Sequence, residues 1–277
     1  MHFLYYNTRM AVYFFYGEED FNIEQEVEKL KGTLDPNFLE MSFKIYDNPK
    51  FADLISILRT QPMMFGKILI VIKCLDYFSK TFEDKEIKQI TKALEDNNEN
   101  LDIIFVAELP RDEGKKLDSR KKFFKLLHKF NAKEFATIPT YKVAELEGWI
   151  QKQAKTKKLK LTQDALTAMI SQIGYNLRQI DKELDKLQLA AYPENVVNAE
   201  MVKENCISNE DLFAFSDYLM AGEKDSALRE YRKLLEKKYC LEIVSTLQTM
   251  IRRWIVLKAR STEMSTFELS KLTGQHE

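Results

Sequence analysis

The chain has 277 residues, a mass of 32.6 kDa and a net charge of −1 at pH 7. This near-neutral balance excludes a protein drawn to nucleic acid by a global basic field, and no apolar run reaches the roughly 18 residues that span a bilayer. With only 8 glycines and 6 prolines, turn formers are scarce, which argues against an all-β fold and favours helices joined by short connections.

Predicted strands and helices alternate in the first half of the chain. Continuous apolar runs indicate strands that are buried on both faces, and three-four spacing of apolar residues indicates helices. The predicted strands are residues 11–16, 39–43, 68–72, 101–107 and 134–136. The predicted helices are residues 23–30, 51–58, 84–95 and 118–130. The alternation predicts an α/β domain with a parallel sheet.

The turn after the first predicted strand carries three consecutive acids. Gly17 is followed by Glu18, Glu19 and Asp20, at the place where a phosphate-binding loop would carry GxxxxGK[ST]. No GK[ST] occurs in the sequence, and like charges at short range would repel a triphosphate. A divalent cation is an alternative ligand, but acids at a helix N-terminus are already favoured by the helix dipole, so we predict neither a metal nor a cofactor here.

The connection before the strand at residues 68–72 has an unusual composition. Pro62 and Gly66 bracket three large apolar side chains, Met63, Met64 and Phe65. One interpretation is that these side chains cap the core beneath the loop. The other is that they form an exposed anchor for a partner protein, because methionine adapts to irregular grooves and phenylalanine offers a large rigid surface.

After Pro139 the strand signal stops and the pattern becomes helical. Residues 141–153 form a helix, Thr162 is the predicted N-cap of the helix over 165–173, and a further apolar stripe leaves Glu183 and Lys186 on the solvent side. Residues 208–211 read as a capping box that opens a last helical section over 213–258. The three cysteines are predicted to be reduced core thiols of a cytoplasmic protein: Cys74, Cys206 and Cys240.

Basic residues gather in two places, although the chain as a whole is nearly neutral. Residues 111–133 hold nine Lys/Arg against three Asp/Glu, and a second lysine-rich stretch covers residues 152–160. The two readings are a solvated face and a surface that contacts phosphates. The candidates for DNA contact are Lys121, Lys122, Lys125, Lys157 and Lys158.

Taken in order, six phrases of the sequence resemble the delta subunit family of the bacterial DNA polymerase III clamp loader. They are YFFYGEEDF, QPMMFGKILIVIK, LDIIFVAE, KKLDSRKKFFKLLHKFNAKEF, GYNLRQIDKELDKLQLAAY and DLFAFSDYLMAGEKDSALREYRKLL. The resemblance covers nearly the whole chain. It implies an AAA+-like α/β domain without a working P-loop over 1–140, a small helical lid over 141–207 and a helical collar for oligomerisation over 208–277. The family's final domain usually runs further, so the collar is expected to be truncated.

The resemblance also implies a function. Delta subunits bind the beta sliding clamp and open the ring for loading on primed DNA. The contact pair carried over is Met64 and Phe65, flanked by Met63 and Pro62, and Lys67 is expected to make a rim contact at most. The implied partners are the gamma/tau and delta-prime subunits and primer-template DNA, in the cytoplasm and with no membrane. We expect no intrinsic catalysis, although a holoenzyme subunit is sometimes classed with the nucleotidyltransferase.

Two alternatives from other functional classes stay open. An ATP-dependent AAA-type remodeller would hydrolyse ATP, which the missing phosphate lysine and the absence of an Asp-Glu pair after LDIIFVA oppose. A stand-alone nucleic-acid-binding protein would bind DNA strongly and with a steep salt dependence.

Overall fold

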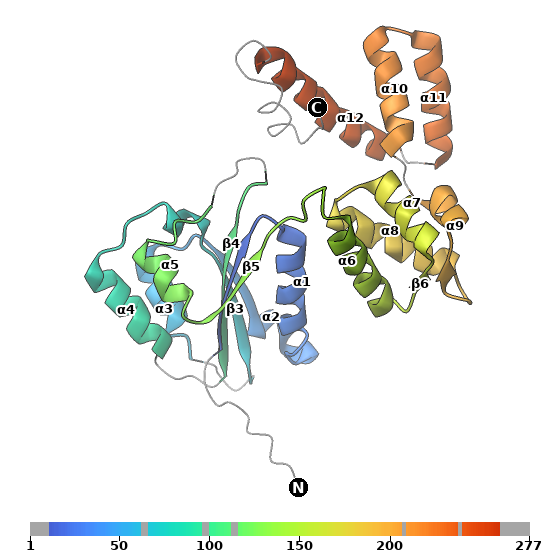
Figure 1. The fold of residues 1–277 in the computed structure, drawn as a ribbon. Helices are drawn as coiled ribbons and strands as arrows, with labels where there is room; N and C mark the ends of the chain where they lie inside the picture. Colours follow the sequence, from blue (N-terminus) through green and yellow to red (C-terminus); the bar gives the residue numbers. More distant parts are fainter. Residues whose placement is uncertain are drawn as a thin grey trace. The chain divides into compact units, whose positions relative to one another are not determined.

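The computed structural model describes residues 11–61, 66–95, 100–111, 116–206, 209–237 and 240–260. The chain divides into two compact units, Met1–Thr137 and Ile138–Glu277. Figure 1 shows a sheet with helices in the first unit and mainly helices in the second. No helix in the described part of the chain is both long and apolar enough to cross a membrane.

The first unit is a five-stranded sheet in the order β2-β3-β4-β1-β5, with every neighbouring pair parallel. The strands are β1 (Val12–Gly17), β2 (Phe43–Asp47), β3 (Ile68–Lys73), β4 (Leu101–Glu108) and β5 (Asn131–Phe135). The nearly unbroken burial of β3 and β4 follows from their position between other strands, with helices on both faces. The predicted α/β class with a parallel sheet is confirmed.

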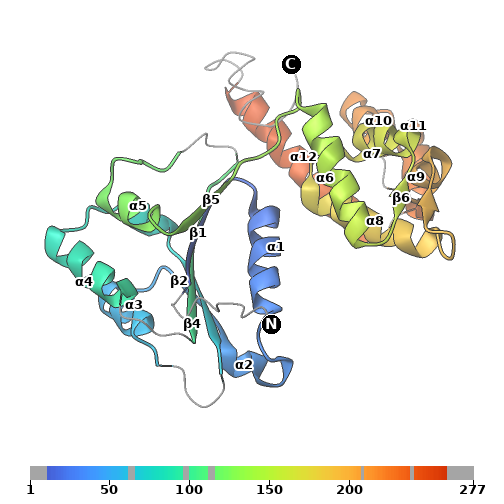
Figure 2. The ribbon, with the colours of Figure 1, turned by 60° about the horizontal axis from the view of Figure 1, so that its bottom comes forward.

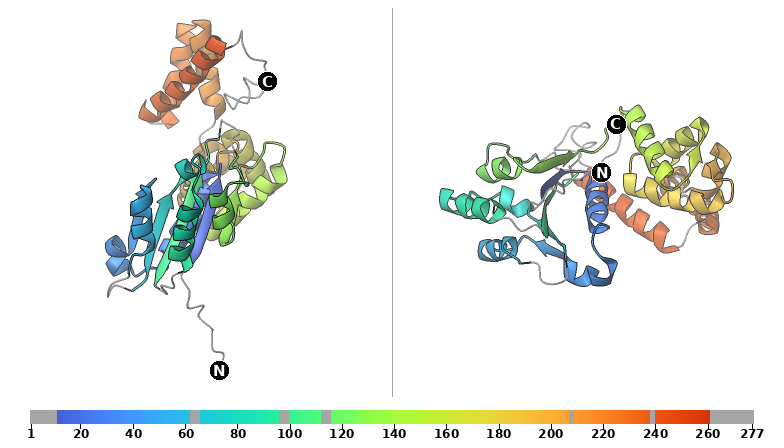
Figure 3. Two further views of the ribbon diagram at one scale, coloured as in Figure 1. Left: turned by 90° about the vertical axis from the view of Figure 1, so that its left-hand side faces the viewer. Right: turned by 90° about the horizontal axis from the view of Figure 1, so that it is seen from below.

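Helices cover the two faces of this sheet as separate layers. One face carries α1 (Asp20–Lys31) and the short α2 (Leu39–Ser42), and the other carries α3 (Phe51–Leu58), α4 (Asp84–Glu95) and α5 (Lys122–Leu127) (Figure 2). The view from below in Figure 3 shows the same two layers. Because side chains alternate along a strand, Phe14 packs in the α3–α5 layer while its neighbour Phe15 packs in the α1 layer.

The prediction of a strand over residues 39–43 was wrong. Residues 39–42 form α2, and the strand begins only at Phe43. The helical turn starts upstream, where Asp35 accepts a hydrogen bond from the backbone N–H of Asn37 at the start of η1 (Pro36–Phe38). β2 is an edge strand whose residues Lys44 and Ile45 are exposed, so the true strand lacked the continuous apolar run that marks β3 and β4.

Two further elements begin at other residues than predicted. β5 starts at Asn131, three residues before the prediction, because its first residues, Asn131 to Lys133, form no apolar run and lie at the other edge of the sheet. α5 starts at Lys122, later than predicted, because the side chain of Asp118 accepts hydrogen bonds from the backbone and guanidinium of Arg120 and holds a turn.

The second unit contains seven helices among the residues described. They are α6 (Val143–Thr156), α7 (Gln163–Ile173), α8 (Leu177–Ala190), α9 (Ala199–Asn205), α10 (Asn209–Ala221), α11 (Lys224–Lys237) and α12 (Cys240–Arg260). The N-cap prediction for Thr162 is confirmed, because its hydroxyl accepts from the backbone N–H of Ala165 at 3.2 Å. Ser208 of the predicted capping box lies outside the described residues.

Two predictions for this unit were wrong. A small parallel pair, β6 (Lys160–Leu161) with β7 (Val196–Val197), follows Pro139 although no strand was expected there; two-residue strands carry no periodicity to detect. Glu183 was placed on the solvent side but is 2% exposed. Its carboxylate is paired with Lys186 at 2.6 Å, which supplies the counter-charge that lets an acid occupy a buried helix position.

The prediction that the cysteines are buried core thiols is confirmed for two of the three. Cys74 and Cys206 are buried, whereas Cys240, at the start of α12, is exposed. Burial raises the pKa of Cys206 to about 12, with a further contribution from the carboxylate of Glu183, and burial also raises the pKa of Cys74. Since the thiolate is the reactive form, both buried thiols should be inert in the folded chain.

Alkylation should therefore distinguish the three cysteines. At about pH 8, iodoacetamide should modify Cys240 rapidly in the folded protein and should reach Cys74 and Cys206 only after denaturation. Intact-mass spectrometry over time measures this, and Cys240→Ser is the control that should abolish the fast phase. Rapid labelling of Cys206 in the folded Cys240→Ser protein would contradict the assignment.

Candidate functional site

The carboxyl ends of the parallel strands meet at one edge of the sheet, where open α/β folds bind their ligands. β1 ends there at Gly17, whose φ of +139° lies in the region that favours glycine. A Cβ at Gly17 would lie 2.1 Å from the carbonyl oxygen of Phe135 at the end of β5. Glycine therefore allows β1 to end in close contact with β5 before the chain enters α1.

The acidic turn follows Gly17 in the sequence. Arg111, which comes after β4, binds the side chains of this turn. One guanidinium nitrogen lies 2.8 Å from Glu19 and 2.7 Å from Asp20, and its Nε donates to the carbonyl oxygen of Glu18 at 3.3 Å. The Glu18 carboxylate accepts a hydrogen bond from the hydroxyl of Thr137 at 3.2 Å. The Glu19 side chain is 2% exposed, so its charge is removed from water and neutralised within the protein.

The backbone of the turn is also engaged internally. The N–H of Glu19, at the N-terminus of α1, donates to the carbonyl of Phe135 at 3.0 Å. In a phosphate-binding loop such N–H groups point at the phosphates and a lysine adds positive charge. Here the N–H is occupied, the side chains are acidic, and Arg111 is bound to them. The geometry opposes nucleotide binding at this edge.

The sequence pattern predicts the acidic turn but carries no signal for its partner. Arg111 belongs to the basic stretch that is one candidate for a phosphate-contacting surface, whereas the fold brings it to acids more than 90 residues earlier in the chain. Among the described residues, no group of three or more His, Cys, Asp and Glu side chains is placed to hold a metal ion.

Removing Arg111 should destabilise the first unit. Arg111→Met leaves the buried Glu19 carboxylate without this partner and should lower the free energy of unfolding by about 2 kcal/mol, less than for a fully buried pair because Arg111 is 38% exposed. Urea unfolding followed by circular dichroism measures the change. Arg120→Met is the matched control, since its pair with Asp118 is 89% exposed on the arginine side and should contribute little. Equal stability of the Arg111 variant and the wild type would contradict the role of this pair.

The amino ends of the strands form the opposite edge of the sheet, and β3 begins there, shortly after the predicted clamp contacts in the sequence. Pro62, Met63, Met64 and Phe65 lie outside the described residues. Their flanks are described: α3 ends at Leu58, and the chain re-enters at Gly66 with φ of +82°. Because β3 begins at Ile68, Gly66 and Lys67 lie at the edge opposite the acidic turn.

An ion pair between a buried carboxylate and a partly exposed lysine holds the chain where it enters β3. Lys67 Nζ lies 2.6 Å from a carboxylate oxygen of Asp102 on β4, and the Asp102 side chain is 5% exposed. The other carboxylate oxygen accepts from the backbone N–H of Ala11, just before β1, at 3.4 Å. The next residue, Ile68, donates its N–H to the carbonyl of Asn100 at 2.7 Å. The only sequence signal for this arrangement was one acid within the apolar run LDIIFVA.

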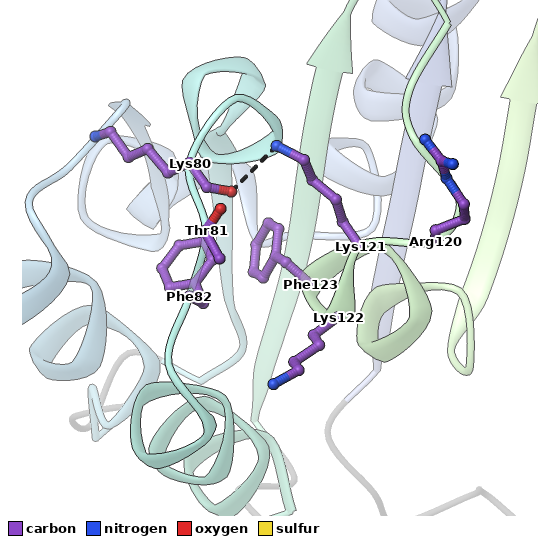
Figure 4. A pocket seen from close by; sticks show the side chains of 7 residues that line it. All are labelled: Lys80, Thr81, Phe82, Arg120, Lys121, Lys122 and Phe123. Carbon is purple, nitrogen blue, oxygen red and sulfur yellow. Dashed lines mark hydrogen bonds between the residues drawn. The ribbon is translucent and has the colours of Figure 1, made fainter.

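Two of the predicted DNA-facing lysines of the first unit, Lys121 and Lys122, line a pocket but do not converge in it. The pocket is bordered by Lys80, Thr81, Phe82, Arg120, Lys121, Lys122 and Phe123. Figure 4 shows the charged ends of the lysines and of Arg120 pointing in different directions around the two phenylalanine rings. Lys121 donates to the carbonyls of Phe78 and Lys80, and Lys122 pairs with Asp84 at 2.6 Å. This arrangement does not build a phosphate site.

The remaining basic candidates differ in their surroundings. Lys125 on α5 and Lys158 after α6 are exposed. Lys157 is 16% exposed at its side chain and forms ion pairs with Asp181 and Asp185 of α8, so its charge ties α6 to α8. Of the five candidates, Lys125 and Lys158 are therefore the exposed lysines that the ion pairs described above do not engage.

Comparison with known proteins gives consistent matches. Residues 13–136 match the family model described as DNA polymerase III, delta subunit. A probable DNA polymerase III subunit delta of Aquifex aeolicus (strain VF5) is 24% identical over 234 residues, which are 81% of this chain and 63% of that protein. The chain thus spans less than two thirds of that relative's length.

Among solved structures, the Bacillus subtilis DNA clamp loader delta protein (YqeN) has a similar fold. Its TM-score is 0.68 at 17% identity, over 97% of this chain and 80% of that one. The Thermotoga maritima RuvB Holliday junction branch migration motor matches at a TM-score of 0.40 and 12% identity, over 77% of this chain and 70% of the motor.

Proposed function

We propose that this chain, whose residues 13–136 match the DNA polymerase III delta-subunit family, binds the beta sliding clamp and opens the ring for loading on primed DNA. It does so as a subunit of the clamp loader in the bacterial cytoplasm, next to the gamma/tau and delta-prime subunits. In this proposal the first unit contacts the clamp, residues 141–207 form a lid and residues 208–277 form a collar that joins the neighbouring subunits.

The observation that supports a role without ATP hydrolysis is the acidic turn occupied by Arg111. Its charges and the N–H of Glu19 are bonded to other parts of the same unit, at the place where a motor subunit would bind triphosphate. The chain therefore contributes binding energy, while ATP is bound and hydrolysed by other subunits. Nucleotidyl transfer is assigned to the polymerase rather than to this subunit.

The clamp contact is assigned to Met64 and Phe65, with Pro62 and Met63 beside them. Burial of two such side chains in an apolar pocket would supply about 1.5–3 kcal/mol each, which is typical of interface hot spots. Affinity alone does not open a ring, because a ligand shifts an equilibrium only through its preference for one state. The loop must therefore fit a ring subunit with a relaxed interface better than it fits the closed ring.

The proposal also includes contact with primer-template DNA. Exposed lysines such as Lys125 and Lys158 would contact phosphates inside the assembled loader, without reading sequence. The near-neutral charge of the whole chain agrees with DNA contact that depends on the assembly.

The test is binding of the purified chain to its cognate sliding clamp by surface plasmon resonance, with and without ATP. We expect a Kd between about 1 nM and 1 µM that ATP does not change. A folded chain that fails to bind the clamp, but binds DNA tightly and with a steep salt dependence, would replace this proposal with the stand-alone DNA-binding alternative. ATP hydrolysis by the isolated chain would instead favour a remodelling motor.

A further inference from the structure

The amino edge of the sheet contains a buried carboxylate where an apolar residue would be expected. β4 is buried from Leu101 to Ala107, and Asp102 is the charged member of that run, 3% exposed. Removing a carboxylate from water costs several kcal/mol unless a counter-charge and hydrogen bonds compensate it. Lys67 at 2.6 Å and the N–H of Ala11 at 3.4 Å provide these contacts.

The same contacts bring three chain segments together at one point. Lys67 precedes β3, Asp102 belongs to β4, and Ala11 precedes β1. The carboxylate on β4 therefore holds the starts of β3 and β1, the two strands that flank β4 in the sheet. Lys67 is 42% exposed at its side chain, so the pair bridges the interior and the surface. A buried acid in this position fixes the direction in which the chain passes from Gly66 into the sheet.

We propose that Asp102 is a positioning residue for clamp binding, which acts through Lys67 to hold the end of the segment that carries the clamp contacts. This inference rests on the proposed function. Holding the chain in one direction before binding reduces the conformational entropy lost on association, so the pair should increase affinity without touching the partner. Gly66, with φ of +82° next to Lys67, is the turn that this anchor supports.

The chain offers a matched control on the same two strands. Lys73 at the end of β3 pairs with Glu108 at the end of β4, with an Nζ to carboxylate distance of 3.2 Å. This pair is also lysine on β3 with an acid on β4, but it lies at the carboxyl edge, away from the loop. If the loss of any β3–β4 ion pair weakened clamp binding, variants of both pairs would show the effect. A positioning role predicts instead that only loss of the Lys67–Asp102 pair weakens clamp binding.

The experiment measures dissociation from the cognate clamp by surface plasmon resonance for the full chain. Asp102→Asn keeps an oxygen for the N–H of Ala11 but loses the charge, and it should dissociate about tenfold faster than the wild type, as should Lys67→Met. The double variant should dissociate no faster than either single variant, because both remove one pair. Lys67→Arg should retain the wild-type rate, and Glu108→Gln should also leave it unchanged.

The outcomes separate this inference from the proposed function. If the wild type binds the clamp and both Asp102→Asn and Lys67→Met dissociate at the wild-type rate, the positioning role is wrong and the proposed function stands. Equal acceleration by Glu108→Gln would also overturn it, since the effect would then be one of general sheet stability. Absence of binding by the folded wild type overturns both. If Asp102→Asn fails to fold, Lys67→Met decides the question because its side chain is partly exposed.

Discussion

The double variant Met64→Ser with Phe65→Ser should lose clamp binding by about a hundredfold or more, because two apolar anchors contribute roughly 1.5–3 kcal/mol each. Serine is small and polar, so it removes the apolar surface and adds a hydroxyl that an apolar pocket would leave without a partner. Surface plasmon resonance against the cognate clamp measures the loss, and circular dichroism shows whether the variant is folded.

A matched control removes exposed apolar side chains elsewhere. Leu189 and Tyr192 are 81% and 79% exposed in the second unit, so Leu189→Ser with Tyr192→Ser removes a comparable aliphatic and aromatic pair. This control should bind the clamp like the wild type. If the loop variant unfolds, Met64 and Phe65 belong to the core, as the alternative interpretation of the sequence holds. If it is folded and binds normally, the clamp contact lies on another surface.

The second large effect is expected at Gly17, where alanine should lower the free energy of unfolding by about 3 kcal/mol or more. The residue has φ of +139°, which an L side chain rarely adopts, and the added Cβ would lie 2.1 Å from the carbonyl oxygen of Phe135. The neighbour is backbone and cannot rotate away, so β5 itself would have to move. Urea unfolding followed by far-UV circular dichroism measures the loss.

Gly148 provides the control for the same substitution. It lies inside α6, and a Cβ there would meet no atom within 4 Å. Alanine has the higher helix propensity, so Gly148→Ala should raise stability by up to about 1 kcal/mol. Opposite signs at the two positions would follow from the positive φ of Gly17 and from its contact with β5, both of which Gly148 lacks. A Gly17→Ala protein as stable as the wild type would show that β5 can shift without cost.

Local sequence patterns predicted those elements whose burial is uniform. β3 and β4 lie between other strands, so their apolar runs are continuous and easily recognised. β2 and β5 lie at the edges of the sheet and have exposed residues, so neither forms a continuous apolar run. The prediction therefore placed the first strand over residues 39–43 instead of β2 and began the second three residues too late. Thr162 was recognised as an N-cap because capping is a contact over three residues and leaves a local signature.

The parallel α/β class of the first unit and the lack of a phosphate-binding lysine in the turn after β1 can be predicted from the amino-acid sequence, because both depend on residue types within a short window. The partners of the acids in that turn and of Asp102 become visible only in the folded chain. Arg111 meets Glu19 across 92 positions, and Lys67 meets Asp102 across the boundary between two strands. The strand order places these partners together, and ion pairs between distant segments carry no periodicity along the chain.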